Sequence, residues 1–378
     1  MAARITGRLA QVGRILTPEG WRTARIEAVG ASISAVVPLS LGAAAAFELP
    51  RVVPGFLDLH CHGSDGIDVM GAEMPADWAH LSHGLASHGV TGFLATVMTA
   101  PRAEMLSVRP PVALDGAACL GVHWEGPHLS REWAGAQPPD ALRRPDVREL
   151  ESAWRTVPLV LATVAPELPG ALDAIRTLCA HGVRVNLGHS GATYEQAGEA
   201  FDAGADGVTH AFNAMPPWHH RRPNLLARAL DTPGVWIEAI VDGVHLHPAT
   251  VRLLLRAAQG RVVAVTDASR LAGTSESSGD LGGHPVVVRG GAAWLAHQPN
   301  TLAASVLTAD RGVANLLAWG VPWEDAVRAW TQAPALRLGL GERGRLAVGA
   351  RADWVVLSEA VEVLETVVGG QVVFRRAG

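Results

Sequence analysis

The stretch "VVPGFLDLHCHG", residues 52–63, introduces the pattern from which the fold can be predicted, because an apolar, β-branched run ends there in two histidines. In an extended strand successive side chains point to opposite faces, so His60 and His62 share one face and Cys61 points the other way. Two imidazoles that converge at a strand end could hold a metal ion. They could equally be ordinary polar residues that close a strand, so the remaining sequence has to decide between the two interpretations.

Similar apolar runs recur along the chain, and Ala/Leu-rich helical segments lie between most of them. The eight runs are "VVPGFLDLH" (52–60), "GVTGFLATV" (89–97), "ACLGVHWE" (118–125), "VPLVLATVAPE" (157–167), "GVRVNLGHS" (182–190), "ADGVTHAFN" (205–213), "GVWIEAIVDG" (234–243) and "RVVAVTDAS" (261–269). Buried parallel strands that alternate with helices eight times predict an α/β fold, a (β/α)8 TIM barrel. A doubly wound open sheet has the same local pattern and remains the alternative.

The two ends of the chain differ from this middle region. The first ~50 residues and the tail both contain short alternating runs separated by glycine turns, which predict strands. We expect the two ends to pair into one small β domain. Residues 303–340 have helical patterning, and we expect them to pack on the outside of the barrel.

Composition excludes several classes of partner. Of the 378 residues, 48% are hydrophobic and 18% are charged, the net charge is −5, and the basic residues are scattered, so we expect no nucleic-acid partner. No apolar stretch reaches the ~18 residues of a membrane-spanning helix, and the first residues lack the apolar core of a signal peptide, so we expect no membrane partner. Three cysteines, Cys61, Cys119 and Cys179, form no C-x-x-C pair, which fits reduced thiols in a cytoplasmic protein.

The chain contains no lysine: all 31 of its Lys+Arg positions are arginine. This excludes a P-loop lysine, a Schiff-base lysine and a lysine general base. It also excludes a metal site bridged by a carboxylated lysine. The absence of lysine therefore removes mechanisms without naming one.

Polar residues stand at the carboxyl ends of the predicted strands, which form one face of a barrel and are where active sites are built. They are His60, His62, Glu125, His189, His210, Asp242, His245 and Asp267. Imidazole and carboxylate ligands suit a divalent metal such as zinc, and a hydrolytic metal keeps one position open for water. Asp267 could shuttle a proton from that water to a leaving group, or it could be a metal ligand only.

Several motifs in order resemble those of the N-acetylglucosamine-6-phosphate deacetylases of the amidohydrolase superfamily. The resemblance runs over nearly the whole chain and is carried by "PGFLDLHCHG", "GVHWEGPHLS", "NLGHSGATYEQ", "THAFNAMPPWHHRRP", "VDGVHLHP", "VTDASRLAG", "NTLAASVLTAD" and "GERGRLAVGARADWVVL". It implies a metal-dependent hydrolase that removes acetate from the 2-acetamido group of N-acetylglucosamine 6-phosphate. It also implies a homodimer, a (β/α)8 barrel over residues 51–341, and a small β-sandwich domain formed by residues 1–50 and 342–378.

The same resemblance assigns roles to individual residues. It makes Glu125, His189 and His210 the principal metal ligands, Asp267 the catalytic acid/base and His245 a substrate contact that polarises the carbonyl. Arg221 matches an arginine that binds phosphate, which family members can donate across the dimer, so we expect it near the interface. The other matched substrate contacts are Ala136, Gln137, Asn213, Ala214, Leu302, Ala303 and Ala304.

The chain departs from the family pattern around the substrate. Ala134 and Gln137 stand where many members have lysine and histidine, Arg222 follows Arg221, and His128 replaces a common aromatic. Arg221 suits phosphate because a guanidinium gives bidentate hydrogen bonds, although both arginines could be ordinary surface residues. These departures concern residues around the substrate and not the metal ligands, so they bear on the identity of the sugar and not on hydrolysis.

The retained His-x-His pair bears on the number of metal ions. Some family members have lost the pair and work with one ion, whereas this chain keeps His60 and His62, and Glu125 is the only candidate to bridge two ions. We therefore expect one or two divalent ions per chain, with zinc as the expected metal. In the two-ion arrangement Glu125, His189 and His210 hold one ion, and His60, His62 and Glu125 hold the other, near Asp267.

Other functions stay open at this point. One is deacetylation of N-acetylgalactosamine 6-phosphate, which differs from the gluco sugar by one epimeric hydroxyl. Another is a different amidohydrolase activity, such as an N-acyl amino acid deacylase or a deaminase. A third is a sugar-phosphate sensor without activity, which would have no need of the proton shuttle that Asp267 offers.

Overall fold

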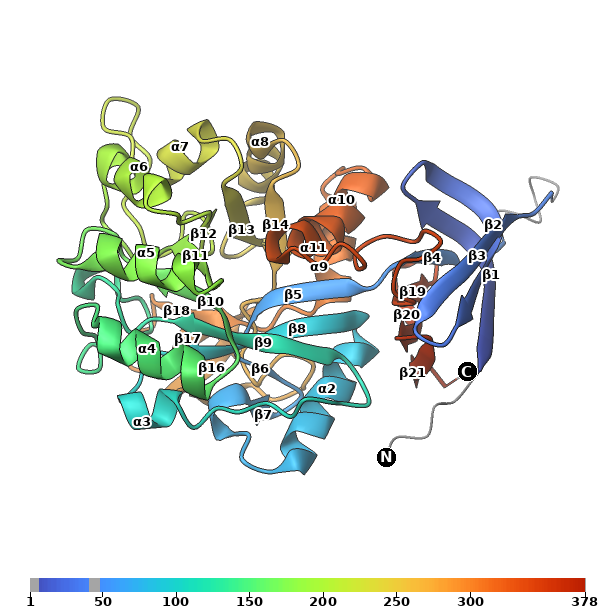
Figure 1. Cartoon of the computed structure of the whole chain (residues 1–378), viewed down its shortest axis with the longest axis horizontal. Helices are drawn as coiled ribbons and strands as arrows, with labels where there is room; N and C mark the ends of the chain where they lie inside the picture. Colours follow the sequence, from blue (N-terminus) through green and yellow to red (C-terminus); the bar gives the residue numbers. More distant parts are fainter. Residues whose placement is uncertain (1–6, 41–47, 378) are drawn as a thin grey trace.

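The computed structural model describes residues 7–40 and 48–377, and its larger part is a barrel of parallel strands (Figure 1). The eight-stranded sheet has the order β14-β13-β12-β11-β10-β9-β8-β5, so neighbours in sequence are neighbours in space. Each predicted apolar run supplies one strand of this sheet, which confirms the predicted TIM barrel, although residues 52–54 of the first run belong to the sheet formed by the two ends of the chain. The strands are β5 (Phe56–Cys61), β8 (Val90–Met98), β9 (Ala118–Glu125), β10 (Leu159–Val164), β11 (Arg184–Leu187), β12 (Gly207–Val208), β13 (Trp236–Ile240) and β14 (Val262–Val265).

The barrel closes between its first and last strands through the residues that follow β14. The Asp267 amide donates to the His60 carbonyl at 2.8 Å, and the His62 amide donates to the Ala268 carbonyl at 2.9 Å. Cys61 and Ala268 form an isolated parallel bridge at the same place. Main-chain hydrogen bonds therefore join the His-x-His motif directly to the segment that carries Asp267.

Helices surround the barrel, as the alternating pattern predicts. They are α2 (Pro75–Ser87), α3 (Arg102–Met105), α4 (Val147–Thr156), α5 (Ala171–Ala180), α6 (Tyr194–Asp202), α7 (Leu225–Asp231), α8 (Pro248–Ala258), α9 (Ala309–Ala318), α10 (Trp323–Trp330) and α11 (Gln332–Leu338), with short 3-10 turns η1 (Val69–Gly71) and η2 (Arg131–Trp133). Local sequence explains where some begin. Thr193 and Gln196 form a capping box at the start of α6, and Pro248 occupies the first turn of α8.

The two ends of the chain share one seven-stranded sheet of order β21-β20-β19-β4-β1-β2-β3 (Figure 1, right). Its strands are β1 (Arg8–Thr17), β2 (Gly20–Val29), β3 (Ser32–Pro38), β4 (Arg51–Pro54), β19 (Trp354–Leu357), β20 (Val363–Val368) and β21 (Gln371–Arg375). Side chains from both ends of the chain, Ile26 and Trp354 among them, enclose a core separate from that of the barrel. This is the predicted small β domain, while residues 1–6, 41–47 and 378 of the predicted terminal segments lie outside the described residues.

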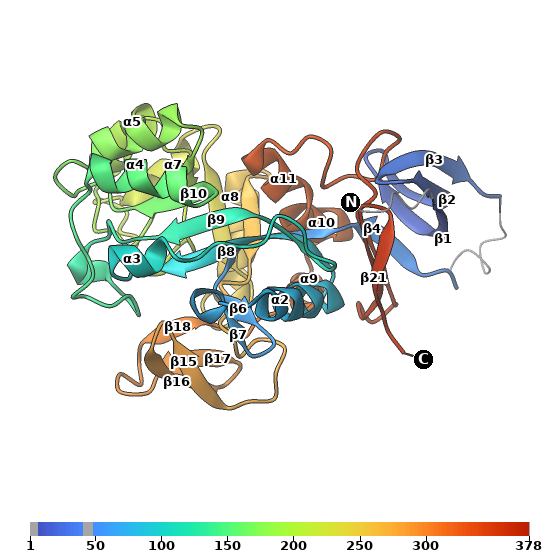
Figure 2. The same ribbon diagram turned by 60° about the horizontal axis from the view of Figure 1, so that its bottom comes forward.

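A four-stranded antiparallel sheet that was not predicted lies beside the barrel (Figure 2). It contains β15 (Ser278–Leu281), β16 (His284–Arg289), β17 (Ala292–Leu295) and β18 (Leu302–Ser305), and a small pair, β6 (Gly63–Ser64) and β7 (Ile67–Asp68), follows β5. The helical expectation for residues 303–340 is wrong at its start, because residues 303–305 are in β18. Ser305 bonds to Asp267 and Ser269 there, and this pairing overrides the helical preference of the alanines.

Within the ranges that the structure describes, no helix is both long and apolar enough to cross a membrane.

Candidate active site

Six of the eight polar residues predicted at the strand ends line one cavity of about 470 Å³, and the other two, His60 and Asp242, contact the lining residues His62 and His245. Its lining includes His62, Glu125, His189, His210, His245 and Asp267. Glu125 is the last residue of β9, and the others lie in the loops that follow β5, β11, β12, β13 and β14. The cavity therefore opens at the carboxyl ends of the barrel strands, where TIM-barrel active sites are found.

One group of potential metal ligands surrounds Oε1 of Glu125. Nε2 of His189 lies 3.1 Å from this oxygen and Nε2 of His210 lies 3.0 Å from it, and the two ring nitrogens are 3.0 Å apart. All three side chains are buried. Both histidines have positive φ, 47° and 28°, a conformation that is uncommon for non-glycine residues and that clusters at functional sites.

A second group shares the same carboxylate. Nε2 of His60 and Nε2 of His62 are 3.2 Å apart. The His60 nitrogen lies 3.4 Å from Oε1 of Glu125, and the His62 nitrogen lies 3.3 Å from Oε2. Oδ1 of Asp267 is 3.2 Å from His62 and 3.4 Å from His60. In each of the two groups the ligand atoms lie within 4.8 Å of one another. Glu125 is thus placed between two clusters of imidazole nitrogens.

The chemistry of these donors fits a cation. Two imidazole nitrogens that face each other at about 3 Å repel each other if both carry lone pairs, and a proton or a metal ion between them removes this repulsion. Burial opposes the charged forms of His60 and His62, yet Asp267 and Glu125 outweigh it, so the pKa of His60 is well above its usual range and that of His62 is raised to about 9. Although burial opposes their ionisation, the nearby histidines lower the pKa values of Glu125 and Asp267. By donor type and spacing, both groups of residues could hold a divalent ion.

Neighbouring groups orient two of the imidazoles. Nδ1 of His189 lies 2.9 Å from the Trp133 carbonyl, and Nδ1 of His60 lies 3.3 Å from Oε2 of Glu238. An acceptor at Nδ1 keeps the proton there and leaves Nε2 free to face the other candidate ligands. Sequence reasoning missed Glu238, and the available signal was a carboxylate in the middle of the apolar residues 235–241, which contain no other charged residue.

Gln137, predicted as a substrate contact, lines the cavity and also contacts Glu125. Its amide nitrogen donates to Oε2 of Glu125 at 2.6 Å, and its amide oxygen accepts from the Thr99 backbone at 2.8 Å. The Thr99 contact fixes which end of the amide faces the carboxylate. Both ends of the Gln137 side chain are therefore engaged by the protein.

Several other predicted substrate contacts reach the cavity. The lining includes Ala136, Asn213, Ala214, His245, Leu302 and Ala304. Nδ1 of His245 lies 2.6 Å from Oδ2 of Asp242, which leaves Nε2 of the ring available to a ligand.

Two predicted substrate residues lie elsewhere. Ala303 alternates with its cavity-lining neighbours on β18 and packs into an apolar cluster with Met98 and Leu271. Arg221 is exposed, is not among the residues that line the cavity, and contacts His220 at 3.0 Å. The arginine predicted to bind phosphate therefore stands outside the cavity of its own chain.

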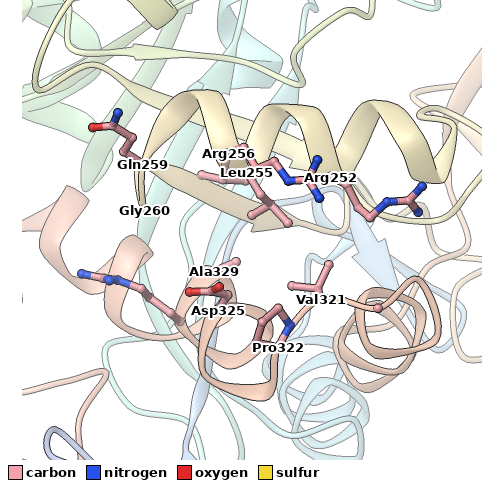
Figure 3. Close-up of a pocket in the computed structure, with 12 residues that line it drawn as sticks. Arg252, Leu255, Arg256, Gln259, Gly260, Val321, Pro322, Asp325 and Ala329 are labelled. Carbon is pink, nitrogen blue, oxygen red and sulfur yellow. The ribbon is translucent and has the colours of Figure 1, made fainter.

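Another cavity, of about 570 Å³, lies between α8 and α10 (Figure 3). Arg252 and Arg256 line it from α8, and Asp325 and Arg328 line it from α10. None of the predicted site residues and no histidine belongs to its lining, so it lacks the groups needed for metal-assisted hydrolysis.

Comparison with known sequences gives concordant matches. The Amidohydrolase family matches residues 51–373. An N-acetylglucosamine-6-phosphate deacetylase of Vibrio furnissii is 39% identical over 336 residues, which cover 86% of this chain and 84% of that protein. An N-acetylgalactosamine-6-phosphate deacetylase of Escherichia coli O157:H7 is 35% identical over 369 residues, which cover 95% and 97%.

Solved structures agree with the sequence matches. The N-acetylglucosamine-6-phosphate deacetylase of Thermotoga maritima superposes with a TM-score of 0.88 at 30% identity, covering 98% of this chain and 100% of that one. A mutant of the Mycobacterium smegmatis enzyme, solved in complex with N-acetyl-D-glucosamine-6-phosphate, also has a TM-score of 0.88, at 33% identity and with 97% and 99% coverage. With a barrel of this kind, two clusters of histidines around Glu125, and a family match over most of its length, the chain belongs to the amidohydrolase family.

Proposed function

We propose that this protein hydrolyses the N-acetyl group of N-acetylglucosamine 6-phosphate and releases glucosamine 6-phosphate and acetate. The observation that carries the proposal is the convergence of Glu125, His189, His210 and Asp267 on one cavity. Relatives at 33–39% identity that carry this activity in their names support the choice of substrate. Hydrolysis rather than sensing is favoured because an ionised carboxylate stands beside the candidate ligands, where binding alone would not need it.

The proposed cofactor is a divalent ion, with zinc as the expected metal. Glu125, His189 and His210 would hold one ion, and His60, His62 and Glu125 would hold a second. When bound, a divalent ion acts as a Lewis acid that polarises the amide carbonyl and acidifies water. The shared carboxylate of Glu125 supports a two-ion arrangement, since each of its oxygens lies within 3.5 Å of imidazole nitrogens.

Asp267 is the proposed general acid and base. Its carboxylate takes a proton from the water that attacks the amide carbon, and it returns that proton to the nitrogen as the C–N bond breaks. Acetate and the free amine are the products. His245 is proposed to contact the carbonyl oxygen through Nε2, because Asp242 occupies Nδ1.

The phosphate is proposed to bind Arg221 of a second subunit. Arg221 is exposed on a loop that also exposes Trp218, which retains 48% of its accessible surface. Such a loop suits a homodimer interface, through which Arg221 would reach the cavity of the partner. We also propose a cytoplasmic location, which the three free thiols support.

The galacto epimer is the second candidate substrate, because an N-acetylgalactosamine-6-phosphate deacetylase aligns over 97% of its own length. Release of acetate from the two phosphorylated sugars, the two free sugars and an N-acetyl amino acid, after loading with zinc, tests both proposals. We expect kcat/KM to be highest for N-acetylglucosamine 6-phosphate. A higher value for the galacto sugar would reassign the substrate. Turnover of none of the sugar phosphates would overturn deacetylation.

A further inference from the structure

A line of buried polar side chains runs from His60 to a helix on the outside of the barrel. Nδ1 of His60 lies 3.3 Å from Oε2 of Glu238, whose Oε1 accepts from the Asn186 amide at 2.6 Å. The Asn186 oxygen in turn accepts from Nη2 of Arg337 at 2.9 Å. These four side chains, which we name the relay, come from β5, β13, β11 and α11 and are at most 4% exposed.

The barrel is shaped to admit this line. A Cβ at Gly207 in β12 would lie 2.0 Å from the Asn186 oxygen and 3.0 Å from Nη2 of Arg337, so only glycine leaves room there. Nη1 of Arg337 is held by Oδ2 of Asp206 at 2.5 Å. The guanidinium is therefore fixed at its outer end while its other nitrogen faces the barrel interior.

The relay has a direction because its outer end can only donate. A guanidinium has no acceptor, so the Asn186 oxygen must face Arg337 and the Asn186 NH2 must face Glu238. Glu238, when ionised, only accepts, so it takes one hydrogen bond from Asn186 and one from Nδ1–H of His60. In the neutral ring that binds a metal ion, a proton on Nδ1 leaves the lone pair on Nε2, which faces Glu125 and Asp267.

We propose that Arg337, Asn186 and Glu238 are positioning residues that set the tautomer and orientation of His60 for the second divalent ion. None of the three reaches the cavity that receives the substrate. The inference rests on the two-ion site of the proposed function. According to this inference, Arg337 in α11, outside the barrel, affects binding of the second ion through Asn186 and Glu238, although none of the three contacts the ion or the substrate.

The first test replaces the acceptor with an amide of the same shape. In Glu238→Gln one oxygen must serve two donors, so either Asn186 or His60 loses its acceptor. We expect the dissociation constant of the second zinc to rise by about 10- to 100-fold while that of the first is unchanged. Competition with a chromophoric chelator measures both constants. Glu365→Gln, which alters a buried carboxylate paired with Arg375 in the terminal sheet, is the matched control.

The second test restores the direction of the relay with a different pair of residues. This double variant combines Asn186→Asp with Glu238→Gln. The amide nitrogen at position 238 donates to the carboxylate at position 186, and the amide oxygen at position 238 still accepts from His60. Arg337 again faces an acceptor, the second carboxylate oxygen at position 186. We expect most of the lost affinity for the second zinc to return. A purely structural role predicts no such recovery, since the double variant changes the interior more than the single one does.

The outcomes separate this inference from the proposed function. If the wild type binds two zinc ions and Glu238→Gln leaves both constants unchanged, the relay has no such role. The same conclusion follows if the double variant binds the second ion no better than Glu238→Gln. A wild type that binds only one ion would overturn the two-ion site and the inference with it, whereas deacetylation of the sugar phosphate is judged independently by acetate release.

Discussion

The side-chain amide of Gln137 donates a hydrogen bond to Oε2 of Glu125 over 2.6 Å. Because Glu125 is the carboxylate shared by both groups of candidate ligands, we expect Gln137→Ala to weaken zinc binding by about tenfold or more. Chelator competition measures the change, and Gln371→Ala, in the exposed edge of the terminal sheet, is the control. A change confined to KM for the sugar phosphate would instead make Gln137 a substrate contact.

Asp267→Asn should keep the fold and the metal but lose nearly all turnover. The amide cannot accept a proton from water or return it to the leaving amine. Asparagine tolerates the positive φ of 48° at this position, so the backbone should not change. Acetate release, zinc content and circular dichroism check the three parts. A kcat near that of the wild type would rule out the assigned role.

Arg221→Ala should raise KM for N-acetylglucosamine 6-phosphate far more than for the free sugar. Loss of a charge-assisted contact costs about 1.5–3 kcal/mol, which corresponds to roughly a 10- to 100-fold change in KM. Steady-state kinetics on both substrates measure the difference, with Arg345→Ala, another exposed arginine, as the control. Equal losses on the two substrates would show that Arg221 does not contact the phosphate.

Replacing both histidines of the His-x-His motif should reduce the number of bound ions. Wild-type protein loaded with excess zinc should approach two ions per chain, and His60→Asn/His62→Asn should approach one, because Glu125, His189 and His210 remain. Elemental analysis gives the ratio directly. One ion per chain in the wild type under these conditions would leave the motif with only a supporting role.

His88 and Asp310 should make stability depend on pH at a place away from the cavity. Nδ1 of His88, at the end of α2, lies 3.1 Å from Oδ1 of Asp310 in the first turn of α9. Burial alone would lower the pKa of His88, but Asp310 outweighs it and raises the pKa above its usual 6.5. Burial likewise opposes ionisation of Asp310, but His88 lowers its pKa below 3.8.

The sign of the effect follows from these directions. The contribution of His88 is fully present below pH 6.5 and is lost as the pH rises through its raised pKa. The contribution of Asp310 is present above pH 3.8 and is lost as the pH falls through its lowered pKa. His88→Asn should therefore cost about 1 kcal/mol of unfolding free energy near pH 6 and less at pH 9. Urea unfolding checks this against His83→Asn, and a cost that does not vary with pH would contradict it.

The barrel could be predicted from sequence because buried parallel strands leave an unmistakable apolar run, and because the ends of all such runs meet on one face. That rule placed His189, His210 and Asp267 in one cavity although they are far apart along the chain. The rule does not extend to β15–β18, whose short strands are separated by two glycine pairs and by the loop 296–301 and follow no single periodicity.

The supporting contacts could not be predicted for a different physical reason. Glu238 lies within an apolar strand, and a single carboxylate there gives no indication of its partner. Arg337 is on a helix, where periodicity identifies the buried face but not a charged side chain that enters the barrel. The bond from Gln137 to Glu125 depends on the path of an irregular loop, which no repeating pattern specifies.

The closure of the barrel bears on how enzymes of this kind can diverge. The spacing between the His-x-His motif and Asp267 is set by main-chain hydrogen bonds, at His60 and Ala268, which side-chain replacement does not remove. One wall of the cavity, in contrast, comes from Leu281 and from residues 300–302 and 304, in and next to the four-stranded sheet outside the ring of barrel strands. Mutation in that sheet can therefore reshape one wall of the cavity while the main-chain bonds keep His60, His62 and Asp267 at the same spacing.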